Sequence, residues 1–117
     1  MQTAQSSVAP LTQKSNLPDE RELLSRAYDC AAALRARSLE IAHARRVPED
    51  VMADLGARGL LQLARPARYG GRDMSMATIL RIGRALGSGD ASVAWVYCVS
   101  SSHDHLVGMY RKFVQDE

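Results

Sequence analysis

Several side chains capable of chemistry lie close together in the stretch DASVAWVYCVSSSHDH, residues 90–105. His103 and His105 could bind a metal ion, and a serine one helical turn before a histidine could belong to a hydrolase site. On a helix, however, His103 and His105 point about 200° apart, too far to converge on one ion. Ser101 lacks the strained turn of a nucleophile elbow, and Asp104, as the sequence neighbour of His105, points away from it. We therefore expect neither a metal site nor a hydrolase triad, and the simplest interpretation is that these side chains bond to the end of the helix.

A different chemistry is indicated by the spacing of the aromatic and apolar side chains. Five residues follow the helical spacing i, i+4, i+8, i+11 and i+15, so they lie on one face of a helix. They are Trp95, Val99, His103, Leu106 and Tyr110. The adjacent stripe consists of Cys98, Ser102, His105 and Met109. Because histidine exchanges a proton near neutral pH, His103 beside Trp95 suits a pocket for a flat, weakly acidic ligand. Val99 and Ser102 would line the same pocket. A histidine packed in the core beside a tryptophan fits this spacing at least as well.

Four segments carry the signals of helices that would position this face. The first is long and amphipathic, and is predicted from about Pro18 to Arg45. The second begins at Pro48 and ends before Gly59. If Gly59 adopts the left-handed conformation, Leu55 and Leu60 fall where a Schellman motif places its hydrophobic contact.

The third and fourth helices complete the predicted fold. The third follows the loop QLARPARYGGRD and is capped by Asp73 or Ser75. Asp90 caps the fourth, in which Ala91–Val99 is apolar on all sides, which predicts a helix surrounded by protein and the most buried of the four. So short an apolar run could also form a β-strand, but the cap and the continuation of the stripe to Tyr110 favour a helix. The chain is thus predicted to be all-α, with about four helices.

The composition fits one small globular domain or part of a larger one. Of 117 residues, 46% are hydrophobic and 24% charged, and 15 basic residues are interspersed with 13 acidic ones, giving a net charge of +2. There is no block of like charges and no apolar run near the roughly 20 residues of a membrane-spanning helix, so neither nucleic-acid nor membrane binding is indicated. Residues 1–17 are polar and aperiodic, which predicts a disordered lead-in without a secretory signal and hence a cytoplasmic protein. Cys30 and Cys98 lack motif spacing and are expected to be free and buried.

Longer motifs in the chain resemble a known family. The loop GLLQLARPARYGG, residues 59–71, then a helix, and then DASVAW, residues 90–95, are similar in order and content to the N-terminal helical domain of the acyl-CoA dehydrogenase superfamily. The resemblance extends from about Glu20 to Tyr110. Within it, RRVPEDVMADL and SVAWVYCVSSSH look more like the flavin-dependent monooxygenase branch, which includes the oxygenase components of two-component aromatic hydroxylases.

The resemblance implies roles for two residues of the helix face. In the monooxygenase branch, a tryptophan of the AWV type is followed on the same helix by a histidine that faces the substrate and the flavin, and these positions are Trp95 and His103 here. His103 would contact or deprotonate a phenol, and Trp95 would shape the pocket near the flavin ring. Branch members often carry a tryptophan two residues after this histidine, where the chain has His105, so the aromatic substrate can differ.

The resemblance also implies what the complete protein contains. Family members continue into a β-barrel domain and a C-terminal four-helix bundle, so we expect an α-domain at residues 18–110, the start of a connector at 111–117, and both later domains absent from this chain. The complete protein would be a homotetrameric flavoprotein of aromatic compound catabolism. It would hydroxylate a phenol-like substrate with O2, using reduced FMN or FAD from a flavin reductase. Residues 1–117 alone are expected to retain no flavin and to show no turnover. The alternatives are part of an FAD-dependent acyl-CoA dehydrogenase and a non-catalytic helical interaction module.

Overall fold

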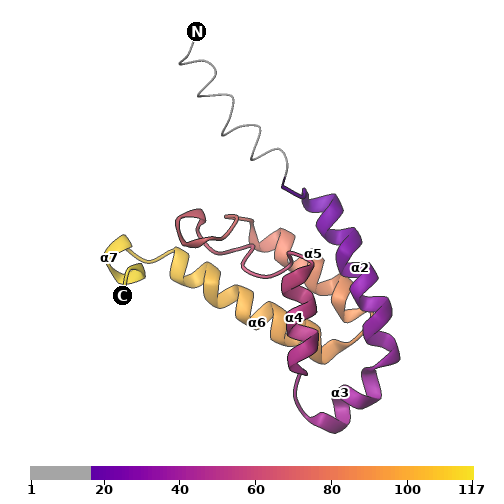
Figure 1. Cartoon of the computed structure of the whole chain (residues 1–117). Coiled ribbons are helices and arrows are strands. Elements are labelled where there is room, and N and C mark those ends of the chain that lie inside the picture. The colour runs from indigo at the N-terminus through magenta and orange to yellow at the C-terminus, as the bar shows by residue number, and fades with distance from the viewer. Residues whose placement is uncertain (1–16) are drawn as a thin grey trace.

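A computed structural model describes residues 17–117, and these residues form an all-α fold (Figure 1). Within them lie the helices α2 (Glu20–Ala36), α3 (Ser38–Ala44), α4 (Glu49–Ala57), α5 (Met76–Gly87), α6 (Ala91–Gly108) and α7 (Lys112–Gln115), and the 3-10 turn η1 (Ala67–Tyr69). The predicted all-α fold is confirmed, and the stretch that could have been a strand lies inside α6. The predicted lead-in lies, apart from Leu17, outside the described residues.

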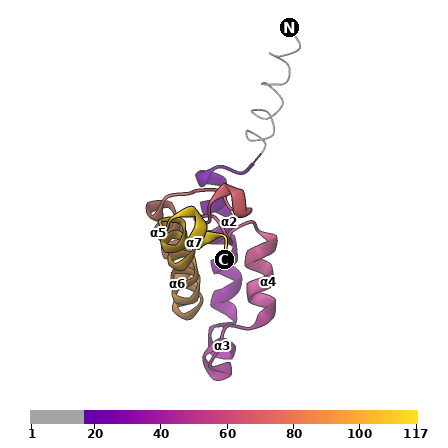
Figure 2. The same cartoon turned by 90° about the vertical axis from the view of Figure 1, so that its left-hand side faces the viewer.

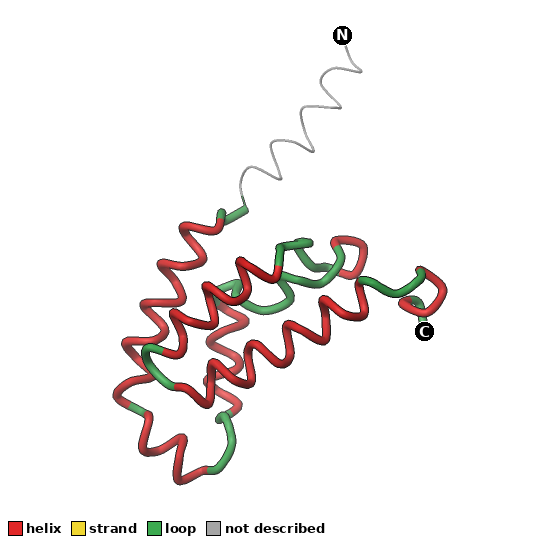
Figure 3. Tube along the Cα trace, turned by 180° about the vertical axis from the view of Figure 1, so that it is seen from behind, coloured by secondary structure: helices red, strands yellow, loops and turns green. Residues whose placement is uncertain are grey.

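The core is built around α5, which packs against both α2 and α6 (Figure 3). In the view of Figure 2, α2 lies between α4 on one side and α5 and α6 on the other. Helices α2, α4, α5 and α6 and the turn after α4 contribute apolar side chains that are fully shielded from solvent, among them Leu23, Leu55, Leu60, Ile79, Ile82, Leu86 and Val93. Fully burying a side chain of this size stabilises the fold by about 1.5–3 kcal/mol. Short α7 lies beyond the end of α6, away from this core (Figure 1).

Two of the predicted helix boundaries are confirmed by their hydrogen bonds. Ser75 is the cap of α5, because its Oγ accepts a hydrogen bond of 3.3 Å from the amide of Thr78. At the end of α4, Gly59 has a φ of 72° and its amide donates to the carbonyl of Gly56 at 3.0 Å. The amide of Leu60 donates to the carbonyl of Leu55 at 3.1 Å, which completes the Schellman motif. The chain therefore reverses at Gly59 and returns toward α6.

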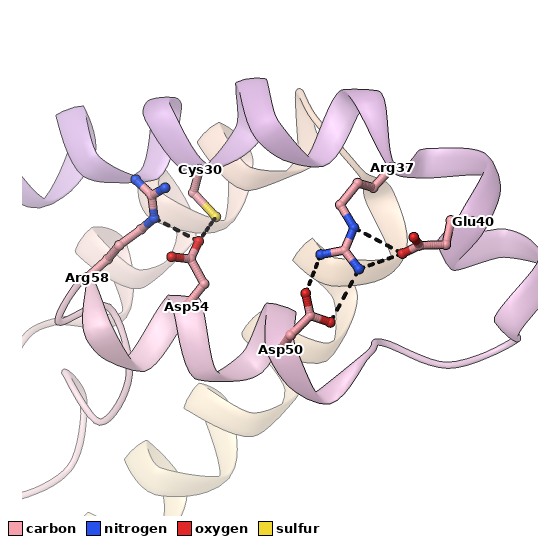
Figure 4. A network of polar contacts seen from close by, with 6 residues as sticks. All are labelled: Cys30, Arg37, Glu40, Asp50, Asp54 and Arg58. Carbon is pink, nitrogen blue, oxygen red and sulfur yellow. Dashed lines mark hydrogen bonds and ion pairs between the residues drawn. The ribbon is translucent and has the colours of Figure 1, made fainter.

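The predicted long first helix is wrong in one respect, because it breaks at Arg37 into α2 and α3. The Arg37 guanidinium donates both to Glu40 on α3 and to Asp50 on α4 (Figure 4). Its hydrogen bonds hold the pKa of the Asp50 carboxyl below its ordinary value, and desolvation opposes this only in part. The apolar pattern runs through the break without interruption, so only the contact with α4 reveals why the helix ends there.

A second polar contact fastens α4 to α2. Asp54 accepts a hydrogen bond of 2.8 Å from Nε of Arg58 and lies 3.7 Å from the Cys30 sulfur (Figure 4). Arg58 in turn accepts, at its carbonyl, a 3.0 Å bond from Arg26 of α2. Burial raises the pKa of the Cys30 thiol, which keeps it protonated and able to donate to the carboxylate. These contacts hold α4 against the side of α2 that faces away from α5.

The close crossing of α5 and α6 depends on Gly83. A Cβ atom placed there would lie 2.3 Å from the sulfur of Cys98, which is half-buried rather than buried as expected. We predict that Gly83→Ala lowers the free energy of unfolding, measured by chemical denaturation, by about 1–3 kcal/mol. The double variant Gly83→Ala/Cys98→Ala should regain most of this loss, because the clashing sulfur is gone. Strict additivity of the two substitutions would contradict the proposed clash.

Candidate functional site

The face predicted to hold the site lies on α6, and most of that helix is open to solvent. Only Val93, Tyr97 and Ser101, spaced four residues apart, are buried. The side chain of Trp95 is 71% exposed. The prediction of a helix surrounded by protein is therefore wrong for the described residues. The reason is that only the stripe of Val93, Tyr97 and Ser101 is fully covered, while the other stripes of α6 are half-buried or exposed in residues 17–117. These continue into α7 as an exposed apolar surface that comprises Trp95, Leu106, Val107, Met109, Tyr110, Phe113 and Val114.

The start of α6 is anchored by Asp90, as predicted. One carboxylate oxygen accepts a 2.9 Å hydrogen bond from the amide of Val93, and the other accepts one of 2.9 Å from the hydroxyl of Ser38. The carboxylate thus joins the first turn of α6 to the first residue of α3, and Asp90 is only 6% exposed. Because α3 and α6 share this contact, their neighbouring surfaces keep a defined relation.

Three of the four predicted site residues meet at one carbonyl oxygen. The hydroxyl of Ser102 donates to the carbonyl of Val99 at 2.8 Å, and Nδ1 of His103 lies 2.8 Å from the same oxygen. A carbonyl oxygen only accepts hydrogen bonds, so Nδ1 must carry the hydrogen. In the neutral ring Nε2 is then the basic nitrogen, and it is free to accept a proton or a hydrogen bond from a ligand. His103 itself is exposed and is not a core histidine in the described residues.

Trp95, the fourth predicted residue, lies on the same face of α6 as His103, but its side chain lines a groove that does not include His103. A groove of about 480 Å³, which we call the Trp95 groove, runs between the end of α3 and the start of α6. Its walls include Trp95, Val96, Ile41, Val47, Arg45 and Arg46. His103 is two helical turns further along and is not part of this wall. The structure therefore places Trp95 and His103 on one surface without enclosing them in one pocket.

The other residues of the 90–105 stretch diverge, as the helical spacing predicted. His105 is half-buried and lines a separate cleft of about 240 Å³ together with Asp73 and Met74. Asp104 accepts hydrogen bonds of 3.3 and 3.2 Å from Nε and an Nη atom of Arg65, which ties the loop before α5 to α6. Ser101 is 6% exposed and cannot serve as an accessible nucleophile. Among residues 17–117, no group of three histidine, cysteine or acidic side chains is arranged to hold a metal ion.

Tyr97 is a structural residue that the sequence pattern concealed within an apolar run. Its side chain is 0% exposed, and its hydroxyl donates a 3.0 Å hydrogen bond to the carbonyl of Leu60. Burial raises the pKa of the Tyr97 hydroxyl, so it stays a donor under all ordinary conditions. The bond fixes α6 to the reversal that follows α4. The i+4 spacing of Tyr97 from Val93 was the only signal in the sequence that Tyr97 would face the core.

We predict that Tyr97→Phe lowers the free energy of unfolding by about 1–3 kcal/mol, because the buried Leu60 carbonyl loses its partner while the apolar packing is kept. Thermal and chemical denaturation would measure the loss. Tyr28→Phe is the matched control, since Tyr28 is 55% exposed and should tolerate the change. Equal stability of the two variants would show that the Tyr97 hydroxyl contributes nothing.

Comparison with known proteins finds one family match and similarity to two curated proteins. Residues 18–117 match the family described as "Acyl-CoA dehydrogenase, N-terminal domain". The chain is similar to p-hydroxyphenylacetate 3-hydroxylase, oxygenase component, of Acinetobacter baumannii, with 33% identity over 73 residues, which is 62% of this chain and 17% of that protein. It is also similar to FADH(2)-dependent resorcinol hydroxylase, oxygenase component, of Rhizobium sp. (strain MTP-10005), with 28% identity over 93 residues, or 80% of this chain and 23% of that protein.

The matches cover only a small part of each relative, because the chain spans about a fifth of the length of the curated proteins it matches. No solved structure gives a significant match. Within the described residues, no helix combines the length and the apolar character that crossing a lipid bilayer requires.

Proposed function

The chain belongs to the acyl-CoA dehydrogenase family, matching its N-terminal domain, and on this premise we propose that it is the N-terminal part of a reduced-flavin-dependent monooxygenase that hydroxylates a phenol-like substrate with O2. The observation that carries the proposal is the orientation of His103. Its Nδ1 is held by the Val99 carbonyl, which leaves Nε2 as a base on an open apolar surface. The two relatives support the same reaction class, since both are oxygenase components of aromatic hydroxylases.

A flavin ring fits this surface on physical grounds. The exposed indole of Trp95 and the half-buried side chain of Val99 offer a flat, apolar wall on which a planar ring can pack. Reduced FMN or FAD, supplied by a separate flavin reductase, would provide the electrons for the hydroxylation and the reduction of O2. The wall is one-sided in the described residues, so the remaining flavin contacts would come from later parts of the complete protein. Covering the wall in this way would also exclude water from the reaction.

His103 would act on the substrate hydroxyl. A phenol within hydrogen-bond distance of Nε2 could donate its hydrogen there, and partial transfer of this proton makes the aromatic ring richer in electrons. The Val99 carbonyl holds the ring of His103 in this orientation, while Ser102 donates to the same oxygen and shares that acceptor. In this proposal His103 is the catalytic residue, and Ser102 and Val99 belong to the wall beside it.

An assay of the complete protein tests the proposal. Purified enzyme supplied with reduced FMN or reduced FAD should consume O2 and convert a phenol to its hydroxylated product in equal amounts. A matched reaction without the phenol should yield no hydroxylated compound. If the bound flavin is instead reduced by an acyl-CoA thioester and no phenol is hydroxylated, the protein is a dehydrogenase and the proposal is wrong.

The same proposal has consequences for assembly and for the 117 residues alone. We expect the complete protein to be a cytoplasmic homotetramer that works with a flavin reductase, which size-exclusion chromatography with light scattering and a coupled assay would test. Residues 1–117 alone should retain no flavin and show no turnover. A yellow complex with stoichiometric flavin would contradict this expectation.

A further inference from the structure

The Trp95 groove combines positive charge with an exposed aromatic ring. Arg45 and Arg46 line it from the end of α3, and within residues 17–117 neither side chain is paired with a carboxylate. Five arginines of the described residues, namely Arg26, Arg37, Arg58, Arg65 and Arg81, each pair with an acidic side chain, and the other unpaired arginines do not line this groove. The two unpaired guanidinium groups therefore stand beside the groove with their donors available.

Arg45 occupies this place at a conformational cost. It ends α3 with a φ of 55°, in the left-handed region where glycine is the usual residue. A side chain with a Cβ atom is disfavoured there, so the backbone gives no reason for an arginine at this position. What the arginine adds is a planar, charged side chain in the wall of the groove.

Apart from Ser92, the remaining wall is apolar and suits a flat ring. Ile41 and Val47 lie on one side, and Trp95 and Val96 on the other. An indole that is 71% exposed presents its surface to a ligand, and stacked aromatic rings gain about 0.5–1.5 kcal/mol beyond the area they bury. The volume of about 480 Å³ lies within the range of sites for small molecules.

From these observations we infer that the Trp95 groove binds an aromatic anion, a flat ring that carries a carboxylate or a phosphate. The ring packs on Trp95, and the anionic group accepts hydrogen bonds from Arg45 and Arg46. Arginine suits this role because its planar fork matches the oxygens of carboxylates and phosphates. The site is distinct from the Nε2 position of His103, and the inference does not rest on the proposed function.

The single tryptophan of the chain makes the inference directly testable. In the ¹⁵N-labelled 117-residue chain, one indole N–H signal reports the groove by nuclear magnetic resonance. Two matched pairs of compounds differ in charge, namely phenylacetate against phenylacetamide and benzyl phosphate against benzyl alcohol. We expect the anion of at least one pair to shift this signal with a Kd about tenfold lower than that of its neutral partner. The pair that responds identifies a carboxylate or a phosphate ligand.

Substitutions assign the binding to the two arginines. Arg45→Gln/Arg46→Gln should abolish the preference for the anion, and the single change Arg46→Gln should weaken it. Arg21→Gln/Arg84→Gln removes the same charge from exposed positions on α2 and α5 and should leave the preference intact. Dispersed amide signals in each variant would confirm that it is folded. Equal affinity for anion and neutral partner in both pairs, or a preference that survives in Arg45→Gln/Arg46→Gln, would overturn the inference.

Discussion

Replacing His103 by alanine in the complete oxygenase should lower the rate of hydroxylation by about 10²- to 10⁴-fold, the range expected when a proton-accepting side chain is removed. The reason is local, because Nδ1 is occupied by the Val99 carbonyl and Nε2 is the only ring nitrogen left for the substrate. The exposed position of His103 predicts little loss of folding stability. Single-turnover kinetics with reduced flavin would measure the hydroxylation step apart from flavin binding.

His105→Ala supplies the matched control for this experiment. It removes the same side chain two residues away, from the cleft that contains Asp73 and Met74. We expect its hydroxylation rate to stay close to that of the unaltered enzyme. If His103→Ala mainly lowers the melting temperature while the rate per folded molecule is kept, His103 is a structural residue.

Gly89→Ala should destabilise the domain by about 3 kcal/mol or more, the upper end of what overpacking costs. A Cβ atom on Gly89 would lie 2.2 Å from the carbonyl oxygen of Ala31 and 2.7 Å from its carbonyl carbon and Cα. These are backbone atoms in the middle of α2, and they cannot move aside as the sulfur of Cys98 can. A loss of this size is a large share of the roughly 5–15 kcal/mol that stabilises a typical domain.

Gly87→Ala provides the comparison, since it changes the same residue type two positions earlier. A Cβ atom at Gly87 would lie 3.4 Å from the Cβ of Ala94, which is near ordinary contact. Gly87 is the last residue of α5, and alanine is a better helix former than glycine by about 1 kcal/mol in helix interiors. Chemical denaturation should therefore find Gly87→Ala neutral or slightly stabilised. Comparable losses of stability in the two variants would show that the contact with Ala31 does not limit how closely Gly89 approaches α2.

The helix ends were predictable where their signals are local. Asp90 needs only the next three residues to act as a cap, and Gly59 needs only the turn before it to complete the Schellman motif. The break at Arg37 was not predictable, because its guanidinium bonds to Asp50 across the gap between α3 and α4. Such a contact depends on the tertiary arrangement and leaves no trace in the apolar spacing.

The candidate site was predictable in part, for the same reason. Helical spacing alone places Trp95 and His103 on one face of α6 and directs His105 elsewhere. How far α6 is buried depends on what packs around it, and the apolar character of Ala91–Val99 overestimated that burial. Arg45 and Trp95 are fifty residues apart in the sequence but line the same groove, and nothing in either segment predicts this.

The exposure of Trp95 also determines what the tryptophan fluorescence of this chain can report. An indole in contact with water emits at long wavelength in the folded chain, much as it does after unfolding, so the emission spectrum should change little on denaturation. Circular dichroism of the helices is therefore the better measure of stability for the glycine and tyrosine variants. A shift of the emission to shorter wavelength would then mean that something has covered the Trp95 face, whether a ligand or another protein surface.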